Sequence, residues 1–215
     1  MEQFYPVFLD MKYKKCLVVG GGRVAARKVK SLLDCGADVT VVSPVLTAEL
    51  KEMAAAETIE YLQEPYNRKQ LEGKFLVIVA TDEQEINRMI AADCFACNVL
   101  VNVVDIPHLC NFYVPSLVSR GPLSIAISTE GKSPAYARLL REELEQSIGE
   151  TDGRFVEYLG KLRPLIMEQV PDPRKRKALY REMAGKEFFA MFKALTPAQL
   201  ELKVKEMIRR YCSSN

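Results

Sequence analysis

KKCLVVGGGRVAARKVKSLLDCGADVTVVSP, residues 14–44, is the stretch that decides the fold. An apolar run at residues 16–19 leads into the turn Gly20-Gly21-Gly22-Arg23-Val24-Ala25, and a segment with helical periodicity follows up to Gly36. This order of strand, glycine-rich turn and helix is typical of dinucleotide-binding proteins, in which the pattern G-x-G-x-x-G/A lies at this junction. The alternative is a tight turn between strand and helix that binds no ligand.

The small residues of this turn have separate roles. Gly20 permits the tight turn, Gly22 lets a pyrophosphate approach the backbone, and Ala25 lets the helix pack closely on the strand. The first N–H groups of the helix have no partner within it, and they lie at the positive end of its dipole. We therefore expect the backbone of Gly22, Arg23 and Val24 to bind the pyrophosphate of a dinucleotide beside the turn at Gly20.

The end of the second expected strand bears on the choice of cofactor. The run at residues 39–42 leads into Ser43-Pro44, where an acidic residue ordinarily binds the adenosine ribose. Ser43 can still bond a ribose hydroxyl, and no Arg or Lys follows immediately to receive a 2′-phosphate. The sequence therefore favours NAD over NADP, with Ser43 and Pro44 at its adenosine end.

Thr81 and Asp82 mark a second position for the same cofactor. They follow the apolar run at residues 75–80, and ligands of parallel sheets bind at the carboxyl ends of the strands. They also suit the N-cap of the next helix, and the two roles are compatible.

Apolar runs alternate with helical patterns between residues 14 and 111. The runs have strand length and are mostly β-branched or aliphatic, which predicts strands at residues 16–19, 39–43, 58–62, 75–80 and 100–104. The helical patterns occupy residues 24–35, 47–55 and 83–97. Because the strands are nearly continuous apolar runs, we expect an α/β fold with a parallel sheet covered on both faces.

The order of elements changes after residue 111. Strands are predicted at residues 111–116 and 122–128, and a helix at 134–148 that Ser133 caps. Everything after Gly149 has helical periodicity, including a capping box from Thr196 to Gln199. Two apolar stripes lie in this part, one of Phe155, Leu159, Leu162 and Ile166 and one of Leu200, Val204, Ile208 and Tyr211. We therefore expect three parts, at residues 1–112, 113–150 and 151–215.

Composition and charge exclude several classes of protein. The net charge of +2, from 30 basic and 28 acidic residues, argues against a nucleic-acid binder, which usually has a basic excess. No apolar run reaches the length of about 18 residues that a membrane span needs, and the N-terminus lacks the order of a secretory signal. We expect a cytoplasmic protein with reduced cysteines and no membrane or nucleic-acid partner.

Asp105 is the strongest candidate for chemistry. It ends an apolar run, so we expect a carboxylate at the carboxyl end of a parallel strand, where it can accept a proton. A turn aspartate without a catalytic role is the alternative. His108 is the single histidine, which excludes a site with several histidines within one chain, and the pair Cys94 and Cys97 lies in a helical pattern, so we predict no metal site.

A second anion-binding position is expected near Ser128 and Thr129. These hydroxyls follow the run at residues 122–128 and precede the N-terminus of the helix predicted from residue 134. Together with His108 they are candidates for contact with the substrate. On the residues alone, the sequence predicts an enzyme that uses a nicotinamide cofactor on an unidentified substrate.

Five segments in the same order resemble a known family. They are Tyr5-Pro6-Val7-Phe8-Leu9, VVGGGRVAARK, VIVATDEQEIN, VNVVDIPHLCNFYVPS and PLSIAISTEGKSPAYARLLREELE. Together, over residues 5–150, they are similar to the N-terminal domain of siroheme synthase, which is a precorrin-2 dehydrogenase. The resemblance implies a Rossmann domain, a central dimerisation region and a C-terminal helical domain, assembled as a homodimer.

The resemblance also implies a reaction. Members of this family oxidise precorrin-2 to sirohydrochlorin with NAD, and some also insert Fe²⁺, a lyase reaction, so Fe²⁺ or Co²⁺ is a further substrate to test. The aspartate that acts as the base in the family falls on Asp105. Fused members carry a methyltransferase domain that this sequence lacks, so we expect a separate protein to supply precorrin-2. A regulatory module that binds NAD without catalysis, and another small-molecule dehydrogenase on the same fold, remain as alternatives.

Overall fold

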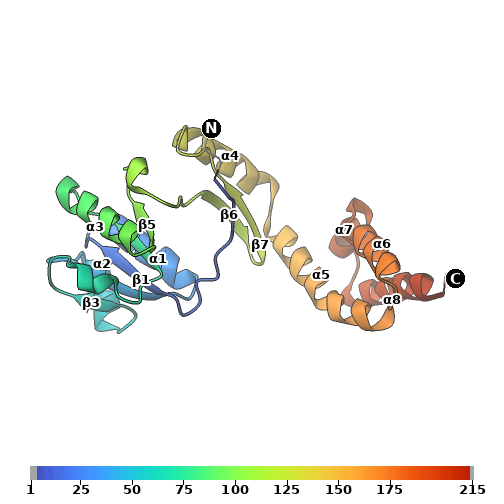
Figure 1. The fold of residues 1–215 in the computed structure, drawn as a ribbon. Coiled ribbons are helices and arrows are strands. Elements are labelled where there is room, and N and C mark those ends of the chain that lie inside the picture. The colour runs from blue at the N-terminus through green and yellow to red at the C-terminus, as the bar shows by residue number, and fades with distance from the viewer. Residues whose placement is uncertain (1–3, 214–215) are drawn as a thin grey trace. The chain divides into compact units, whose positions relative to one another are not determined.

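The computed structural model describes residues 4–213, and contacts within the chain divide it into two units. The first unit runs to Val114 and the second begins at Pro115 (Figure 1). The first contains β1 (Lys15–Val19), α1 (Arg23–Asp34), β2 (Asp38–Val42), α2 (Ala48–Ala55), β3 (Glu60–Leu62), the 3₁₀ helix η1 (Arg68–Leu71), β4 (Leu76–Val79), α3 (Gln84–Ala96), β5 (Leu100–Val103) and the 3₁₀ helix η2 (Pro107–Leu109). The boundaries expected at residues 112 and 150 stay a prediction.

The first unit is built on a parallel sheet. Within the described residues its strands lie in the order β3-β2-β1-β4-β5, and every pair is parallel. From β1 the chain adds β2 and β3 on one side of β1, and then β4 and β5 on its other side. The strand order therefore reverses between β1 and β4, at their carboxyl ends. Ligands of open α/β sheets bind at this point. The predicted parallel sheet is confirmed.

Helices cover both faces of this sheet. On one face Val18 and Val41 pack with Ala25, Val29 and other residues of α1 and α2. On the other face Val19, Val77 and Val101 pack with residues of α3 such as Ile90 and Ala91. Burial on both sides explains why these strands are almost uninterrupted apolar runs.

The strand expected at residues 111–116 is wrong, since β6 begins only at Ser116. Pro115 has no N–H to give to a strand ladder. Before it, the side chain of Asn111 bonds the edge of β5, accepting from the N–H of Val101 at 2.7 Å and donating to the carbonyl of Val99 at 3.0 Å. The segment therefore follows the edge of the sheet mainly through the side chain of Asn111 and does not form a strand.

The second unit begins with a hairpin and continues as helices. Its elements are β6 (Ser116–Arg120), β7 (Leu123–Ile127), α4 (Pro134–Ser147), α5 (Glu150–Gln169), α6 (Pro173–Met183), α7 (Lys186–Ala194) and α8 (Pro197–Ser213). The hydroxyl of Ser133 accepts a bond from the N–H of Tyr136 at 3.3 Å, and the N–H of Gln199 donates to the hydroxyl of Thr196 at 3.4 Å. Both predicted helix caps are confirmed.

The helical core of this unit contains both predicted apolar stripes. Phe155 and Ile166 of α5 and Leu200, Val204 and Ile208 of α8 are buried in one cluster, which the remaining members of the two stripes join partly buried. No helix among residues 4–213 combines the length and the apolar character that crossing a membrane requires.

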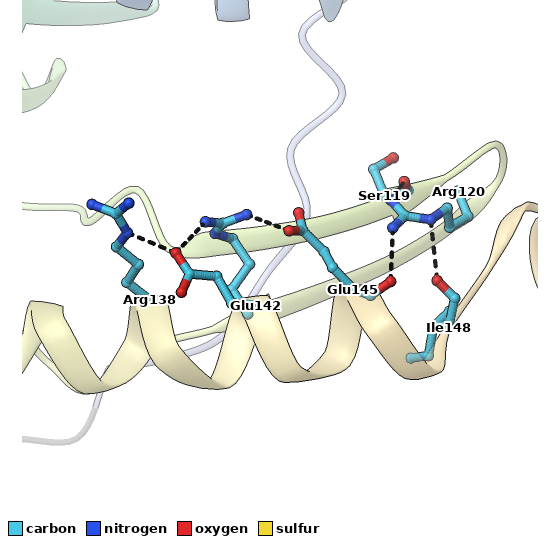
Figure 2. A network of polar contacts seen from close by, with 7 residues as sticks. Ser119, Arg120, Arg138, Glu142, Glu145 and Ile148 are labelled. Atoms are coloured by element: carbon cyan, nitrogen blue, oxygen red, sulfur yellow. Dashed lines mark hydrogen bonds and ion pairs between the residues drawn. The ribbon is translucent and has the colours of Figure 1, made fainter.

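Arg120 fixes the end of α4 to the hairpin (Figure 2). Its guanidinium donates to the carbonyls of Ile148 at 3.1 Å, Glu145 at 3.3 Å and Ser119 at 2.9 Å. The last carbonyls of a helix have no partner within it, and a cation there also opposes the negative end of the dipole. Arg120 therefore stabilises the turn between α4 and α5.

Gly153 lets α5 pack directly on the backbone of β6. A Cβ atom at this position would lie 2.1 Å from the carbonyl oxygen of Arg120. We expect Gly153→Ala to lower the free energy of unfolding by about 3 kcal/mol, because backbone cannot yield as a flexible side chain does. Gly160→Ala on the same helix is the control, since its Cβ would meet nothing within 4 Å and alanine favours a helix by up to ~1 kcal/mol. Urea denaturation of both variants measures the difference, and equal effects would contradict the contact.

Candidate active site

The glycine turn lies at the carboxyl ends of three strands. The N–H of Gly20, directly after β1, donates to the carbonyl of Val42 at the end of β2 at 2.9 Å. Gly20 has a φ of +120°, and a Cβ on it would lie 2.2 Å from the carbonyl oxygen of Ala80, which follows β4. Only glycine fits here, because the backbone after β4 occupies the space and the conformation disfavours a side chain.

The loop after β2 packs on the same turn. A Cβ on Gly21 would lie 1.9 Å from the carbonyl oxygen of Val45, and the N–H of Thr47 donates to the carbonyl of Gly21 at 2.9 Å. The loops that follow β1 and β2 thus pack backbone against backbone.

Gly22 differs from its two neighbours because the space around it is open. It is the N-cap of α1 with a φ of −83°, no side chain caps the helix, and a Cβ would meet nothing within 4 Å. No acidic residue lies in the first turn, and Arg23 and Val24 are exposed. Free N–H groups, an open approach and the positive end of a helix dipole fit the pyrophosphate of a dinucleotide.

The hydroxyl of Ser43 is engaged within its own loop. It donates to the carbonyl of Val45 at 2.8 Å, and Ser43 is buried while Pro44 is exposed. The carbonyl of Ser43 also accepts from the hydroxyl of Tyr61 at 3.0 Å. In this arrangement Ser43 holds the loop against Gly21, and because its proton is used in the bond to Val45, a ribose hydroxyl would have to donate to the Ser43 oxygen.

Thr47 carries a buried hydroxyl oxygen without a hydrogen-bond partner among the described residues. It is the N-cap of α2, yet its side chain does not cap the helix, although threonine commonly does so. A buried polar atom without a partner costs about 1–3 kcal/mol. Because the N–H of Thr47 bonds Gly21, this unsatisfied group lies on the loop that packs on the glycine turn.

Thr81 and Asp82 follow β4 on the other side of the switch point. The hydroxyl of Thr81 donates to the side-chain oxygen of Asn87 at 2.6 Å and accepts from the N–H of Glu83 at 3.3 Å. The N-cap of α3 is Glu83, one residue after Asp82 and two after Thr81, so the cap expected at Thr81 or Asp82 lies later than expected. Thr81 instead ties the end of β4 to the buried Asn87, and Asp82 is exposed.

Asp105 lies two residues beyond β5, at the same edge of the sheet. Its φ is +61°, a left-handed conformation that aspartate adopts more readily than most residues, and its side chain is exposed. Lys28 of α1 is half-buried, and burial lowers the pKa of its ammonium, as does Arg27, whereas the carboxylate of Asp105 raises it. The carboxylate of Asp105 and the ammonium of Lys28 on α1 are therefore close enough to interact electrostatically.

The other candidates lie in different places. His108 is exposed on η2, in the same loop as Asp105. Ser128 and Thr129 belong to the second unit, where the hydroxyl of Ser128 accepts from the N–H of Glu130 at 3.1 Å and that of Thr129 from the N–H of Ser133 at 3.2 Å. Their hydroxyls shape the turn that leads into α4.

No group of three or more His, Cys, Asp and Glu side chains that could hold a metal ion occurs within residues 4–213. All six cysteines of the chain are free thiols.

Sequence reasoning missed Lys28 and Thr47 as members of this region. Lys28 is one of several cations in a helix, and nothing in the helical pattern indicates that it faces a loop 77 positions later in the chain. The start of a helix at Thr47 was readable from the sequence, but the failure of its hydroxyl to cap that helix was not.

Comparison with known proteins identifies the class. The family described as "Putative NAD(P)-binding" matches residues 7–116, half of the chain, so the chain belongs to this family. A second family, described as "Sirohaem biosynthesis protein central", matches residues 120–147. The chain thus matches a family of NAD(P)-binding proteins over its first half and a family of siroheme biosynthesis proteins over a short central segment.

Curated relatives are named siroheme synthase. One from Methylobacillus flagellatus is 40% identical over 178 residues, which cover 83% of this chain and 38% of that protein. Another from Neisseria meningitidis serogroup C is 35% identical over 207 residues, 96% of this chain and 43% of that protein. The chain therefore spans about two fifths of the length of the relatives it matches.

One solved structure matches over its whole length. It is described as "SirC, precorrin-2 dehydrogenase", is 28% identical in sequence, and superimposes with a TM-score of 0.78. The match covers 97% of this chain and 100% of that one. The α/β fold with a helical C-terminal part is thereby confirmed.

Proposed function

We propose that this chain is a precorrin-2 dehydrogenase, which oxidises precorrin-2 to sirohydrochlorin with NAD as the hydride acceptor. The observation that carries the proposal is the likeness to SirC over the whole length of both chains. The relatives named siroheme synthase agree with it, since one of them matches 83% of this chain at 40% identity.

NAD is the proposed cofactor, and the first unit supplies its site. The N–H groups of Gly22, Arg23 and Val24 bind the pyrophosphate, while Gly20 holds the turn against Ala80. The loop that follows β2, with Ser43 and Pro44, faces the adenosine end, and its residues up to Thr47 include no cation for a 2′-phosphate. Thr81 and Asp82 are proposed on the nicotinamide side of the switch point.

The oxidation removes one hydride and one proton from precorrin-2. When bound, NAD accepts the hydride at its nicotinamide ring. Asp105 is the proposed base and accepts the proton on its carboxylate, with the ammonium of Lys28 nearby. The exposure of Asp105 suits a large substrate, and we propose His108, in the same loop, as a further contact with the carboxylates of precorrin-2. Ser128 and Thr129 belong to the second unit and are proposed as substrate contacts in their own right.

We propose that the active form is a homodimer. The hairpin β6–β7 is a two-stranded sheet, which is marginally stable alone, and Leu117 of β6 and Tyr136 and Leu139 of α4 are 47%, 54% and 48% exposed. Burial of this apolar surface in a second copy would stabilise the hairpin. We expect light scattering after gel filtration to give twice the mass of 24.3 kDa, and a monomer at micromolar concentration would contradict the proposal.

The test of the function is an anaerobic assay of the purified chain with precorrin-2 and NAD. We expect NADH and the absorption spectrum of sirohydrochlorin to appear together, with a much higher kcat/KM for NAD than for NADP. Binding of NAD without turnover would favour a regulatory module instead. Addition of Fe²⁺ or Co²⁺ to the oxidised product, against a control without protein, tests metal insertion separately.

A further inference from the structure

β5 is the edge of the sheet on the side away from β4, and side chains satisfy its free backbone groups. Asn111 bonds Val99 and Val101 through its amide, and its own N–H donates to the carbonyl of Val101 at 3.0 Å. One step further along the same edge, the N–H of Val103 donates to the sulfur of Cys110 at 3.2 Å. Residues 110 and 111 thus take the place of a neighbouring strand.

The thiol of Cys110 bonds the backbone on both sides of Asp105. The sulfur accepts a hydrogen bond from the N–H of Val103. The S–H group in turn donates to the carbonyl oxygens of Val103, at 3.3 Å, and Ile106, at 3.4 Å. The amide of Asn102 also donates to the sulfur, at 3.6 Å. One side chain therefore spans the turn in which Asp105 has a φ of +61°.

We propose that Cys110 is a positioning residue for Asp105 in the oxidation: its thiol holds the residues before and after Asp105 so that the carboxylate stays at the carboxyl edge of the sheet. This inference rests on the function proposed above. Other bonds in the turn run from Ile106 to Val103 and from Leu109 to Ile106, and they involve backbone alone. Cys110 supplies the side-chain link that closes the turn onto the strand edge.

A thiol suits this position for two reasons. It must donate and accept at once, so it has to stay protonated, and burial raises the pKa of the Cys110 thiol and keeps it neutral. The long C–S bond and large sulfur atom also reach three backbone groups at distances of 3.2–3.4 Å. A serine oxygen is smaller and is held on a shorter bond, so it can make the same bonds only if the turn contracts slightly.

The experiment compares Cys110→Val with Cys110→Ser. Cys35→Ser is the control, because Cys35 is exposed and distant from Cys110 in the sequence. Valine fills the space with one heavy atom more than cysteine and removes the hydrogen bonds, whereas serine keeps a donor and an acceptor. For each protein, kcat with precorrin-2 is divided by the measured number of NAD-binding sites, so that any unfolded fraction is removed from the comparison. The dissociation constant for NAD and the thermal midpoint are measured alongside.

We expect Cys110→Val to lower kcat about tenfold, since a displacement of the base by a fraction of an ångström is costly, while the dissociation constant for NAD changes less than about twofold. Cys110→Ser should recover most of kcat, and Cys35→Ser should match the wild type. Full kcat per NAD site in Cys110→Val would overturn the positioning role and leave the dehydrogenase standing. A loss that serine does not relieve, or an equal loss of NAD binding, would also overturn it. A wild type that forms no NADH from precorrin-2 would instead overturn the proposed function, and the positioning role with it.

Discussion

Replacement of Asp105 by asparagine should reduce the kcat for precorrin-2 oxidation by about 10²–10⁴-fold, the usual contribution of a positioned base. Asparagine is the sharpest substitution, because it adopts a left-handed conformation as readily as aspartate and keeps the φ of +61° without new strain. It removes only the proton acceptor. The thermal midpoint and the dissociation constant for NAD should therefore match those of the wild type.

Asp105→Ala serves as the second variant of this pair. It also removes the base but adds the cost of alanine in a left-handed conformation, so its loss of stability should exceed that of Asp105→Asn while its kcat is equally low. Turnover at the wild-type rate in either variant would show that another group takes the proton. A loss of kcat that follows the loss of NAD binding would point to a structural role.

Gly20 and Gly22 should respond to the same substitution in opposite ways. Gly20→Ala forces a Cβ to within 2.2 Å of the carbonyl oxygen of Ala80 at a φ of +120°, and we expect it to lower the free energy of unfolding by about 4 kcal/mol. Gly22→Ala meets nothing within 4 Å at an ordinary φ. Its cost should stay below ~1 kcal/mol, which reflects the poorer N-cap.

For NAD binding, the variant that changes stability least, Gly22→Ala, should show a direct effect on affinity. In Gly22→Ala the new methyl group occupies the approach to the helix N-terminus, so the dissociation constant should rise about tenfold or more in a protein that stays folded. Denaturation curves together with calorimetric titration of NAD separate the two effects. Unchanged binding by Gly22→Ala would place the pyrophosphate elsewhere, and an unfolding curve for Gly20→Ala that matches the wild type would contradict the contact with Ala80.

Most of the fold was predictable because the strands of the first unit are buried on both faces. Residues such as Val18 and Val77 lie in apolar runs that leave little ambiguity, and the glycine turn marks where the first strand ends. The strand expected at residues 111–116 failed for a local reason. The side chain of Asn111 competes with the backbone for the edge of β5, and an apolar pattern carries no trace of such competition.

The site was predictable only where one short segment determines it. The turn at Gly20 and Gly22 follows from local spacing, but the contact of Thr47 with Gly21 and the effect of Asp105 on the pKa of Lys28 join parts of the chain that are distant in sequence. Such contacts depend on how helices and loops pack. Ser43 shows the same limit, because the partner of its hydroxyl is set by the path of the loop and not by the residue type.

The sealed edge of β5 also bears on the behaviour of the protein at high concentration. An exposed strand edge is a template on which another chain can add a strand, and proteins commonly block it with charge, proline or a covering loop. Here the amide of Asn111 and the thiol of Cys110 occupy those backbone groups. Aggregation by strand addition to β5 is therefore disfavoured. Loss of either side chain would expose backbone groups that another chain could pair with, and loss of Cys110 would also loosen the turn that contains Asp105.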